Sequence, residues 1–230
     1  MKNNRATLGW SRRNTWRYCI ALPNSIWQHG LKPKAFAVLC YLVYRQGHKN
    51  CVALTVEQIM SSLNMSKKVA TENLGVLRSA GFINEDGALA NMVTNLSAGF
   101  FSLPNEVYLL KLSPGALAVY AYLVCCADWR TKKCHPSYKT IAAHTRMCVS
   151  TAENRITELV DAGLIAAEHS DYFRYGLKRI GNNIYTLLSV RGVAEAYYQR
   201  QLQRLEQETA CHKAQKKLES FSCHRPKLSA

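Results

Sequence analysis

Two long apolar runs, residues 35–44 and 116–127, interrupt an otherwise mixed pattern of hydrophobic and polar positions. Pro33 and Pro114 come just before them, and proline is favoured in the first turn of a helix, where its missing N–H costs no hydrogen bond. The pattern therefore predicts two helices that are buried on most sides. Both runs are too short to cross a bilayer, which takes about 20 apolar residues, so we expect no membrane partner.

The chain also repeats itself. Leu22-Pro23-Asn24 recurs as Leu103-Pro104-Asn105, 81 positions later, and the two apolar runs share this offset. After one extra residue in the following loop the offset becomes 82, as in Ala80-Gly81 and Ala162-Gly163. A register held over about 60 residues with one insertion is typical of a duplicated structural unit. We therefore expect two copies of one fold.

In each copy a polar loop leads to a short helix, a tight turn and a longer helix. Thr55 and Gln58 have the spacing of a capping box, and Ser137 is the expected cap in the second copy. The longer helices end before Gly81 and Gly163, at the position where a positive φ is common. The predicted helices span residues 56–63 and 67–80 in the first copy, and 138–145 and 149–162 in the second.

Extended segments follow the longer helices. Residues 165–169 and 183–188 are expected to pair as a hairpin, whereas the first copy has only a short hairpin around Asp86-Gly87. Three helices and a hairpin make a winged helix-turn-helix. The predicted fold is thus mainly α, with two tandem winged helix-turn-helix domains, small β-hairpin wings and a C-terminal helix. The expected divisions are a basic N-terminal arm (1–17), two winged-helix domains (18–99 and 100–190), and a basic C-terminal helix and tail (191–230).

Charge points to the partner. The 230 residues include 30 Lys and Arg against 15 Asp and Glu, which gives a formal net charge of +15. This excess favours a polyanion, so we expect double-stranded DNA as the partner. The first 17 residues carry +5 and the last 40 carry +4, which would strengthen contact with phosphates without reading sequence. Nine cysteines at irregular spacing are typical of reduced thiols, which predicts a cytoplasmic protein.

The longer helix of each copy is expected to enter the major groove with its first turn at the base edges. Asn154 and Arg155 can make bidentate bonds to adenine and guanine, whereas Lys67 and Lys68 suit phosphates. We therefore expect the second copy to supply most of the sequence specificity and the first copy most of the affinity. The candidate DNA-binding residues are Ser66, Lys67, Lys68, Thr71 and Asn73 in the first copy, Ser137, Tyr138, Lys139, Ser150, Thr151, Asn154 and Arg155 in the second, and Arg174, Lys178 and Arg179 in its wing.

The alternative is that these polar side chains are only the solvated face of amphipathic helices. Winged helices also serve as protein-interaction modules, which leaves open an adaptor without direct DNA readout. The salt dependence of binding to duplex DNA discriminates between the two interpretations, because only phosphate contacts release condensed counterions.

Residues 100–165 carry a family resemblance. Their segments Phe-Phe-Ser-Leu-Pro-Asn-Glu, Leu-Ser-Pro-Gly-Ala-Leu-Ala-Val-Tyr and Cys-His-Pro-Ser-Tyr-Lys-Thr-Ile-Ala resemble helix-turn-helix proteins of plasmids and integrative elements in Firmicutes. The first copy is similar to the N-terminal winged-helix domain of plasmid replication initiator protein A. The resemblance implies a bacterial DNA-binding protein, either a transcriptional regulator or a replication initiator of a mobile element, with replication or transcription proteins as partners. Such proteins usually have Ser as the cap of the recognition helix; Ser66 keeps it, but Cys148 replaces it in the second copy.

No enzyme motif is found in the sequence. It lacks the Gly-rich phosphate-binding patterns and the His-Glu-x-x-His pattern, so we expect neither catalysis nor a cofactor. The nearest approach to a metal site is Cys211-His212 with Cys223-His224, a spacing that matches no common zinc module, so we expect no metal.

The C-terminal segment bears on the oligomeric state. Ala194, Tyr198, Leu202 and Leu205 form a stripe that is expected to pack on the second domain or to pair two chains, so both a monomer and a homodimer stay open. Two modules on one chain can also grip direct repeats in DNA without a dimer.

Overall fold

The computed structural model describes residues 19–46, 55–84, 87–174 and 177–222, without the side chains of Gln46, Leu109, 169–182 and 217–222. The described residues up to Val190 form one compact unit, and the described residues from Arg191 onward form a second unit. The first unit is mainly helical with small antiparallel sheets, and it has the predicted winged helix-turn-helix fold. The predicted arm at residues 1–17 lies outside the described residues.

A strand, a 3-10 helix (η) and three α-helices occur in the same order in both halves of the first unit. The first half contains β1 (Cys19–Pro23), η1 (Asn24–His29), α2 (Pro33–Gln46), α3 (Val56–Leu63), α4 (Lys67–Ser79) and α5 (Asn91–Thr94). The second contains β2 (Phe100–Pro104), η2 (Asn105–Leu110), α6 (Pro114–Cys126), β3 (Lys133–Cys134), α7 (Tyr138–Thr145), α8 (Val149–Asp161), β4 (Ile165–Arg174) and β5 (Leu177–Leu187). The starts of β1 and β2 are 81 residues apart and those of α4 and α8 are 82 apart, as the sequence repeat predicts.

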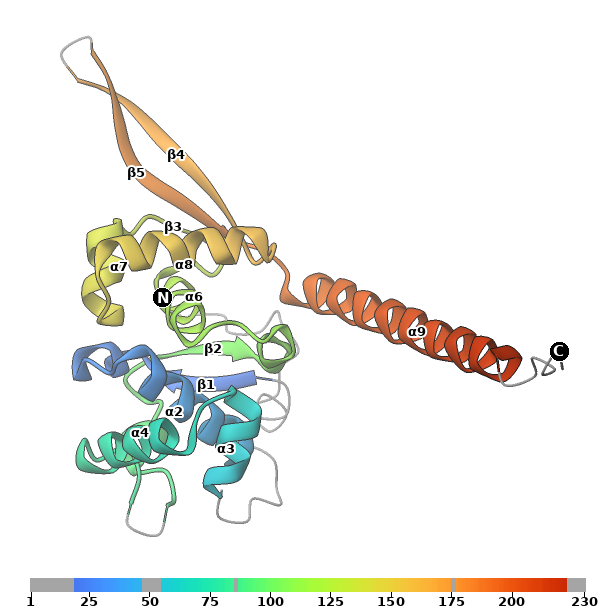
Figure 1. Cartoon of the computed structure of the whole chain (residues 1–230). Helices are drawn as coiled ribbons and strands as arrows, with labels where there is room; N and C mark the ends of the chain where they lie inside the picture. The colour runs from blue at the N-terminus through green and yellow to red at the C-terminus, as the bar shows by residue number, and fades with distance from the viewer. Residues whose placement is uncertain (1–18, 47–54, 85–86, 175–176, 223–230) are drawn as a thin grey trace, which may run out of the picture. The chain divides into compact units, whose positions relative to one another are not determined.

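The two halves share one hydrophobic core, which the sequence did not predict. β1 pairs antiparallel with β2, and Ala21 lies opposite Ser102. α2 packs against α6, and each helix also contacts a strand of the ladder, α2 with β1 and α6 with β2 (Figure 1). Leu22 and Leu103 on the strands are fully buried, as are Val38 and Val119 on the helices. The two halves of the first unit are therefore joined through a common hydrophobic core.

Local capping explains where the helices begin and end. The Thr55 side chain accepts a hydrogen bond from the Gln58 backbone N–H at 3.4 Å, and the Gln58 side chain accepts one from the Thr55 N–H at 3.3 Å, which completes the predicted capping box. Ser113 caps α6 in the same way through the Ala116 N–H. Gly81 and Gly163 follow α4 and α8 with φ of 75° and 71°, which glycine adopts without steric cost.

The wings differ in size, as expected, but the second is longer than predicted. β4 and β5 pair antiparallel over most of their length, with a register shift between His169 and Asp171, and β3 joins the far edge of β5. That shift lets the ladder continue past His169, where the sequence pattern suggested a loop. Among the described residues of the first half, the wing is one antiparallel bridge between Ile83 and Leu89.

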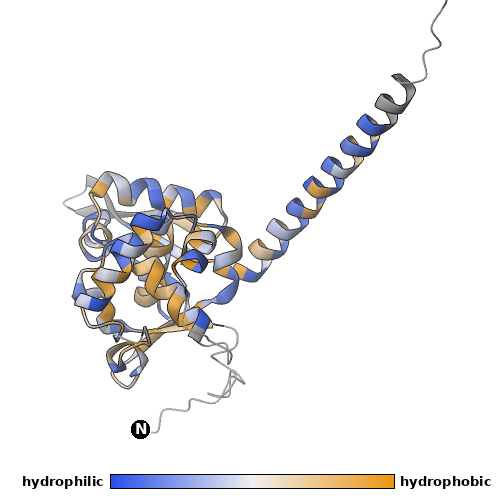
Figure 2. Ribbon diagram, turned by 60° about the horizontal axis from the view of Figure 1, so that its bottom comes forward, coloured by the Kyte–Doolittle hydropathy of each residue, from blue (hydrophilic) through white to orange (hydrophobic). Residues whose placement is uncertain are grey.

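The second unit is a single long helix, α9 (Val190–Ser222), over the residues that the structure describes. Hydrophobic residues are concentrated inside the first unit, whereas α9 is largely hydrophilic (Figure 2). Tyr198, Leu202 and Leu205 of the predicted stripe have exposed side chains. Of the described helices, none combines the length and the apolar character that a membrane span requires.

Candidate nucleic-acid interface

α7 and α8 form the helix-turn-helix of the second half. The Ser137 hydroxyl accepts a hydrogen bond from the Thr140 backbone N–H at 3.1 Å and caps α7. Arg146 ends α7 with a φ of 53°, and the chain turns into α8. The buried side chains of α8 are Ala152, Ile156 and Leu159. Because residues three and four apart share one face of a helix, the opposite face of α8 is free for contacts outside the fold.

That outer face of α8 carries most of the residues predicted to read bases. Ser150 and Asn154 are exposed. Thr151 is half-buried, and its hydroxyl lies 2.9 Å from the Cys148 sulfur. An amide and two hydroxyls on the first two turns give both donors and acceptors to base edges.

Arg155, in contrast to these side chains, is hydrogen-bonded within the protein. Its guanidinium forms an ion pair with Glu158 and donates a hydrogen bond to the Ser113 hydroxyl at 3.1 Å. Glu158 also accepts hydrogen bonds from the Ser113 backbone N–H and hydroxyl. A Cβ at Gly115 would stand only 3.1 Å from the Arg155 Cδ, so glycine leaves room for the arginine stem. The network connects α8 to the start of α6, and guanine contact by Arg155 stays a prediction that requires these bonds to be exchanged.

α4 presents the corresponding surface of the first half. Ser66 caps it by accepting a hydrogen bond from the Val69 backbone N–H at 3.4 Å. Lys67, Lys68 and Thr71 are exposed. The Asn73 side-chain amide donates to the Val69 carbonyl at 2.7 Å, which occupies part of its hydrogen-bonding capacity within the helix.

The remaining predicted residues lie on α7 and on the second wing. Lys139 is exposed and Tyr138 is half-buried. Arg174 lies at the end of β4, and Lys178 and Arg179 lie in β5, so all three belong to paired strands rather than to the predicted loop. Their side chains are outside the described part of the structure, and their contact with DNA stays a prediction.

Cys148 is the N-cap residue of α8, but its side chain makes no capping hydrogen bond. The pKa of the exposed Cys148 thiol is lowered to about 7. The largest cause is its hydrogen bond with the Ser150 hydroxyl, and the next is its hydrogen bond with the Thr151 hydroxyl. Thiolates are also favoured at helix N-termini by the helix dipole. The sequence identified Cys148 only as a weak cap; a thiol directly before a helix with two hydroxyls in its first turn is the signal that predicts this acidity.

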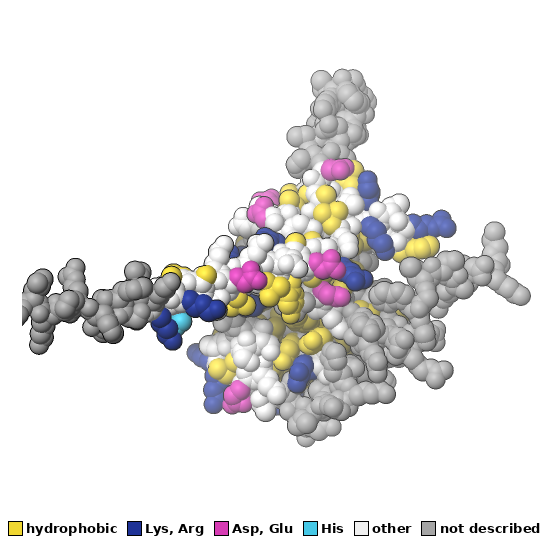
Figure 3. All heavy atoms as spheres, turned by 90° about the vertical axis from the view of Figure 1, so that its right-hand side faces the viewer, with side chains coloured by type: hydrophobic (Ala, Val, Ile, Leu, Met, Phe, Trp, Pro, Cys, Tyr) yellow, Lys and Arg dark blue, Asp and Glu magenta, His cyan; other side chains and the backbone are white. Residues whose placement is uncertain are grey.

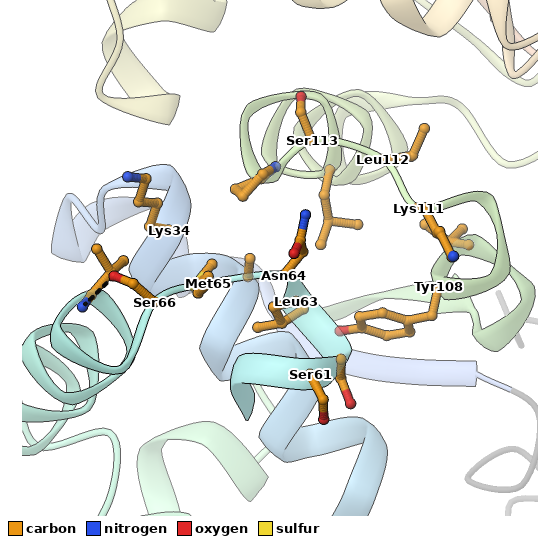
Figure 4. Close-up of a pocket in the computed structure, with 16 residues that line it drawn as sticks. Lys34, Ser61, Leu63, Asn64, Met65, Ser66, Tyr108, Lys111, Leu112 and Ser113 are labelled. Atoms are coloured by element: carbon orange, nitrogen blue, oxygen red, sulfur yellow. Dashed lines mark hydrogen bonds between the residues drawn. The ribbon is translucent and has the colours of Figure 1, made fainter. Parts of the chain in front are cut away.

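A cavity of about 750 Å³ lies where the turn between α3 and α4 meets the start of α6 (Figure 4). Lys34 and Lys111 contribute positive charge to its lining, and Tyr108 contributes an aromatic ring. Asn64, with a φ of 49°, holds the turn on one side. No local sequence pattern indicates this cavity, because its walls come from both halves.

Side chains of different size occupy equivalent positions of the two halves near the cavity. In the second half the Arg146 side chain covers Gly30, where an added Cβ would stand 2.5 Å from an arginine nitrogen. The His144 ring stacks on Tyr122 at a centroid distance of 4.9 Å. The residues equivalent to Arg146 and His144 in the first half are Asn64 and Ser62. Both of these shorter side chains line the cavity.

Charge on the surface is locally mixed. On the face in Figure 3, lysine and arginine side chains form small groups that alternate with acidic and apolar side chains. Cys211 and His212 lie on α9, whereas Cys223 and His224 are outside the described residues. Within the described part of the chain, no three His, Cys, Asp or Glu side chains are grouped as metal ligands.

Comparison with known proteins agrees with the geometry of the second half. Residues 110–165 match a family described as a helix-turn-helix domain, which supports DNA as the partner. Among solved structures, a possible transcriptional regulator from Methanosarcina mazei Go1 is 17% identical, with a TM-score of 0.36 over 50% of this chain and 92% of that one. At this TM-score the similarity adds nothing to the argument. No curated protein matches the chain.

Proposed function

We propose that the protein binds double-stranded DNA sequence-specifically, without catalysis, through both winged-helix modules. The observation that carries the proposal is the outer face of α8, where Ser150 and Asn154 are exposed beside a helix-turn-helix that is capped and packed as a docking unit. The second module, at α4, offers Lys67 and Lys68 to the phosphates.

Transcription regulation is the role that we favour, because a helix-turn-helix with an extended wing is sufficient for it and needs no nucleotide site. The second candidate is replication initiation on a mobile element. The presence of two modules on one chain favours that role, since one chain can then hold two repeated sites in origin DNA without forming a dimer. In both cases replication or transcription proteins would be the further partners. An adaptor that binds only proteins is the competing class.

Fluorescence anisotropy of the full chain with a random duplex, across salt concentrations, tests the proposal. The log–log slope should be about −0.9 per phosphate contacted. Lys67→Ala with Lys68→Ala should reduce the slope by up to about two and weaken binding to all sequences alike.

Lys32→Ala with Lys133→Ala is the matched control, since both lysines are exposed, neither lies on α4, α8 or the basic tail, and the net charge changes equally. A smaller change in the control assigns the effect to α4. A slope that does not depend on salt in the unmodified protein overturns DNA binding in favour of the adaptor.

A further inference from the structure

We infer that one chain recognises an imperfect inverted repeat, with its two half-sites in opposite orientations on the two strands. The inference rests on the proposed function and specifies its target. It comes from the way in which the two modules are joined, which fixes their relative orientation.

The β1–β2 ladder has a local two-fold axis that relates equivalent residues. Ala21 and Ser102 lie directly opposite each other, and they are also the same position of the two repeats, 81 residues apart. The neighbouring pairs Ile20–Leu103 and Leu22–Phe101 exchange when each residue is replaced by its equivalent. An antiparallel pair centred on equivalent residues relates the two chain segments by rotation through half a turn.

Aromatic contacts obey the same symmetry away from the strands. Trp27 of η1 meets Tyr122 of α6 edge-to-face, with ring centroids 5.2 Å apart. The equivalent residues are Tyr108 and Tyr41, which also meet edge-to-face, at 6.2 Å. Each half therefore places an aromatic ring from the equivalent position, Trp27 or Tyr108, against the other half, as the two subunits of a two-fold dimer do.

The relation is fixed by buried structure. All five residues of β1 are buried. Val38 of α2 and Val119 of α6 are both fully buried where these helices pack together. Modules that read direct repeats must be related by translation along the duplex, and these modules would have to unpair β1 from β2 to reach that arrangement. Two-fold related helix-turn-helix modules instead match inverted half-sites, as in symmetric dimers on palindromic operators.

The two half-sites must differ in sequence, because the recognition helices differ. The first two turns of α4 present Lys67, Lys68 and Thr71, whereas those of α8 present Ser150 and Asn154. Among the described residues, an extended wing is found in the second half only. One chain therefore supplies the two two-fold-related modules that a homodimer usually supplies, but the two modules are different and each prefers its own half-site.

Selection from a library of random 30–40 base-pair duplexes, with the full chain as bait, tests the inference. The expected product is two dissimilar half-sites in inverted orientation at one fixed spacing, bound by one chain per duplex in sedimentation. Re-orienting one half-site into a direct repeat at the same spacing should lower affinity by about tenfold or more.

Asn154→Ala should then relax the preference in one half-site and leave the other unchanged, with Thr157→Ala on the same helix as the control. A selected direct repeat, a single half-site, or two duplexes bound per chain overturns the inference while leaving DNA binding intact. Failure to enrich any sequence, together with binding that is independent of salt, overturns the proposed function itself.

Discussion

Arg155 donates a hydrogen bond to the Ser113 hydroxyl, 3.1 Å away, and so connects α8 to the N-cap of α6. Glu158 completes the network by accepting from both residues. In this arrangement Arg155 positions α8, while Asn154, the residue just before it in the chain, is exposed to solvent. Neighbouring positions on one helix thus have different roles.

Arg155→Ala should lower the free energy of unfolding by about 1 kcal/mol, since the charge-assisted bonds are lost but the site is partly open to solvent. Urea denaturation of the full chain measures the change. Arg191→Ala is the matched control. Arg191 pairs with Glu195 on α9, where both side chains are exposed, so this substitution should change the free energy of unfolding by close to zero. Equal stability of the two variants, with lost sequence preference in Arg155→Ala, would reassign Arg155 to base reading.

Asn154→Ala should flatten the preference among DNA sequences by about 1–3 kcal/mol, the discrimination of one bidentate amide–adenine contact. The measurement compares affinities for a selected duplex and a scrambled one at fixed salt. Thr157→Ala serves as the control, because its hydroxyl bonds to the Glu153 carbonyl of its own helix. Unchanged preference in Asn154→Ala would move the reading role to other residues of α8.

DNA affinity should fall as the pH rises from 6 to 8, because the Cys148 thiol has a pKa of about 7 and its thiolate repels phosphates. The expected loss is up to about fivefold, the range of one exposed charge pair. Cys148→Ser should abolish this pH dependence, which anisotropy titrations at constant ionic strength will show. An unchanged pH profile in the variant would exclude Cys148 as its source.

The same thiol makes folding stability depend on pH. Its pKa in the folded protein is about 7, below the value of about 8.5 in an unfolded chain. The stabilisation is therefore complete above the unfolded value and is lost as the pH falls through 7. Urea midpoints of the wild-type protein relative to Cys148→Ser should follow this trend between pH 6 and 9; a flat difference would contradict it.

Gly30→Ala should destabilise the protein by about 1–2 kcal/mol, because Gly30 has a φ of 63° and lies under the Arg146 side chain. Gly75→Ala is the opposite case. Gly75 is exposed within α4 and a Cβ there would meet no atom within 4 Å, so alanine should stabilise by about 0.5–1 kcal/mol. Thermal unfolding of both variants checks the contrast, and shifts of the same sign would refute it.

Local signals in the sequence were sufficient for most of the fold. The Thr55–Gln58 capping box, the glycines after α4 and α8, and the apolar runs of α2 and α6 each act within a few residues, and the structure confirms the helices that they predict. The repeat then required that both halves contain the same elements. The limits of the second wing were wrong, because a register shift at His169 extends the ladder and no local pattern announces it.

Tertiary structure alone decided how these elements combine. Ala21 and Ser102 pair across 81 residues of chain, and strand pairing at such a distance depends on which buried faces meet rather than on local preference. The same is true of Arg155, whose partner Ser113 is 42 residues away. The sequence therefore determined the two helix-turn-helix units and their candidate side chains. Packing determined their two-fold relation and the hydrogen bonding of Arg155 to Ser113, because both depend on contacts between segments that are distant along the chain.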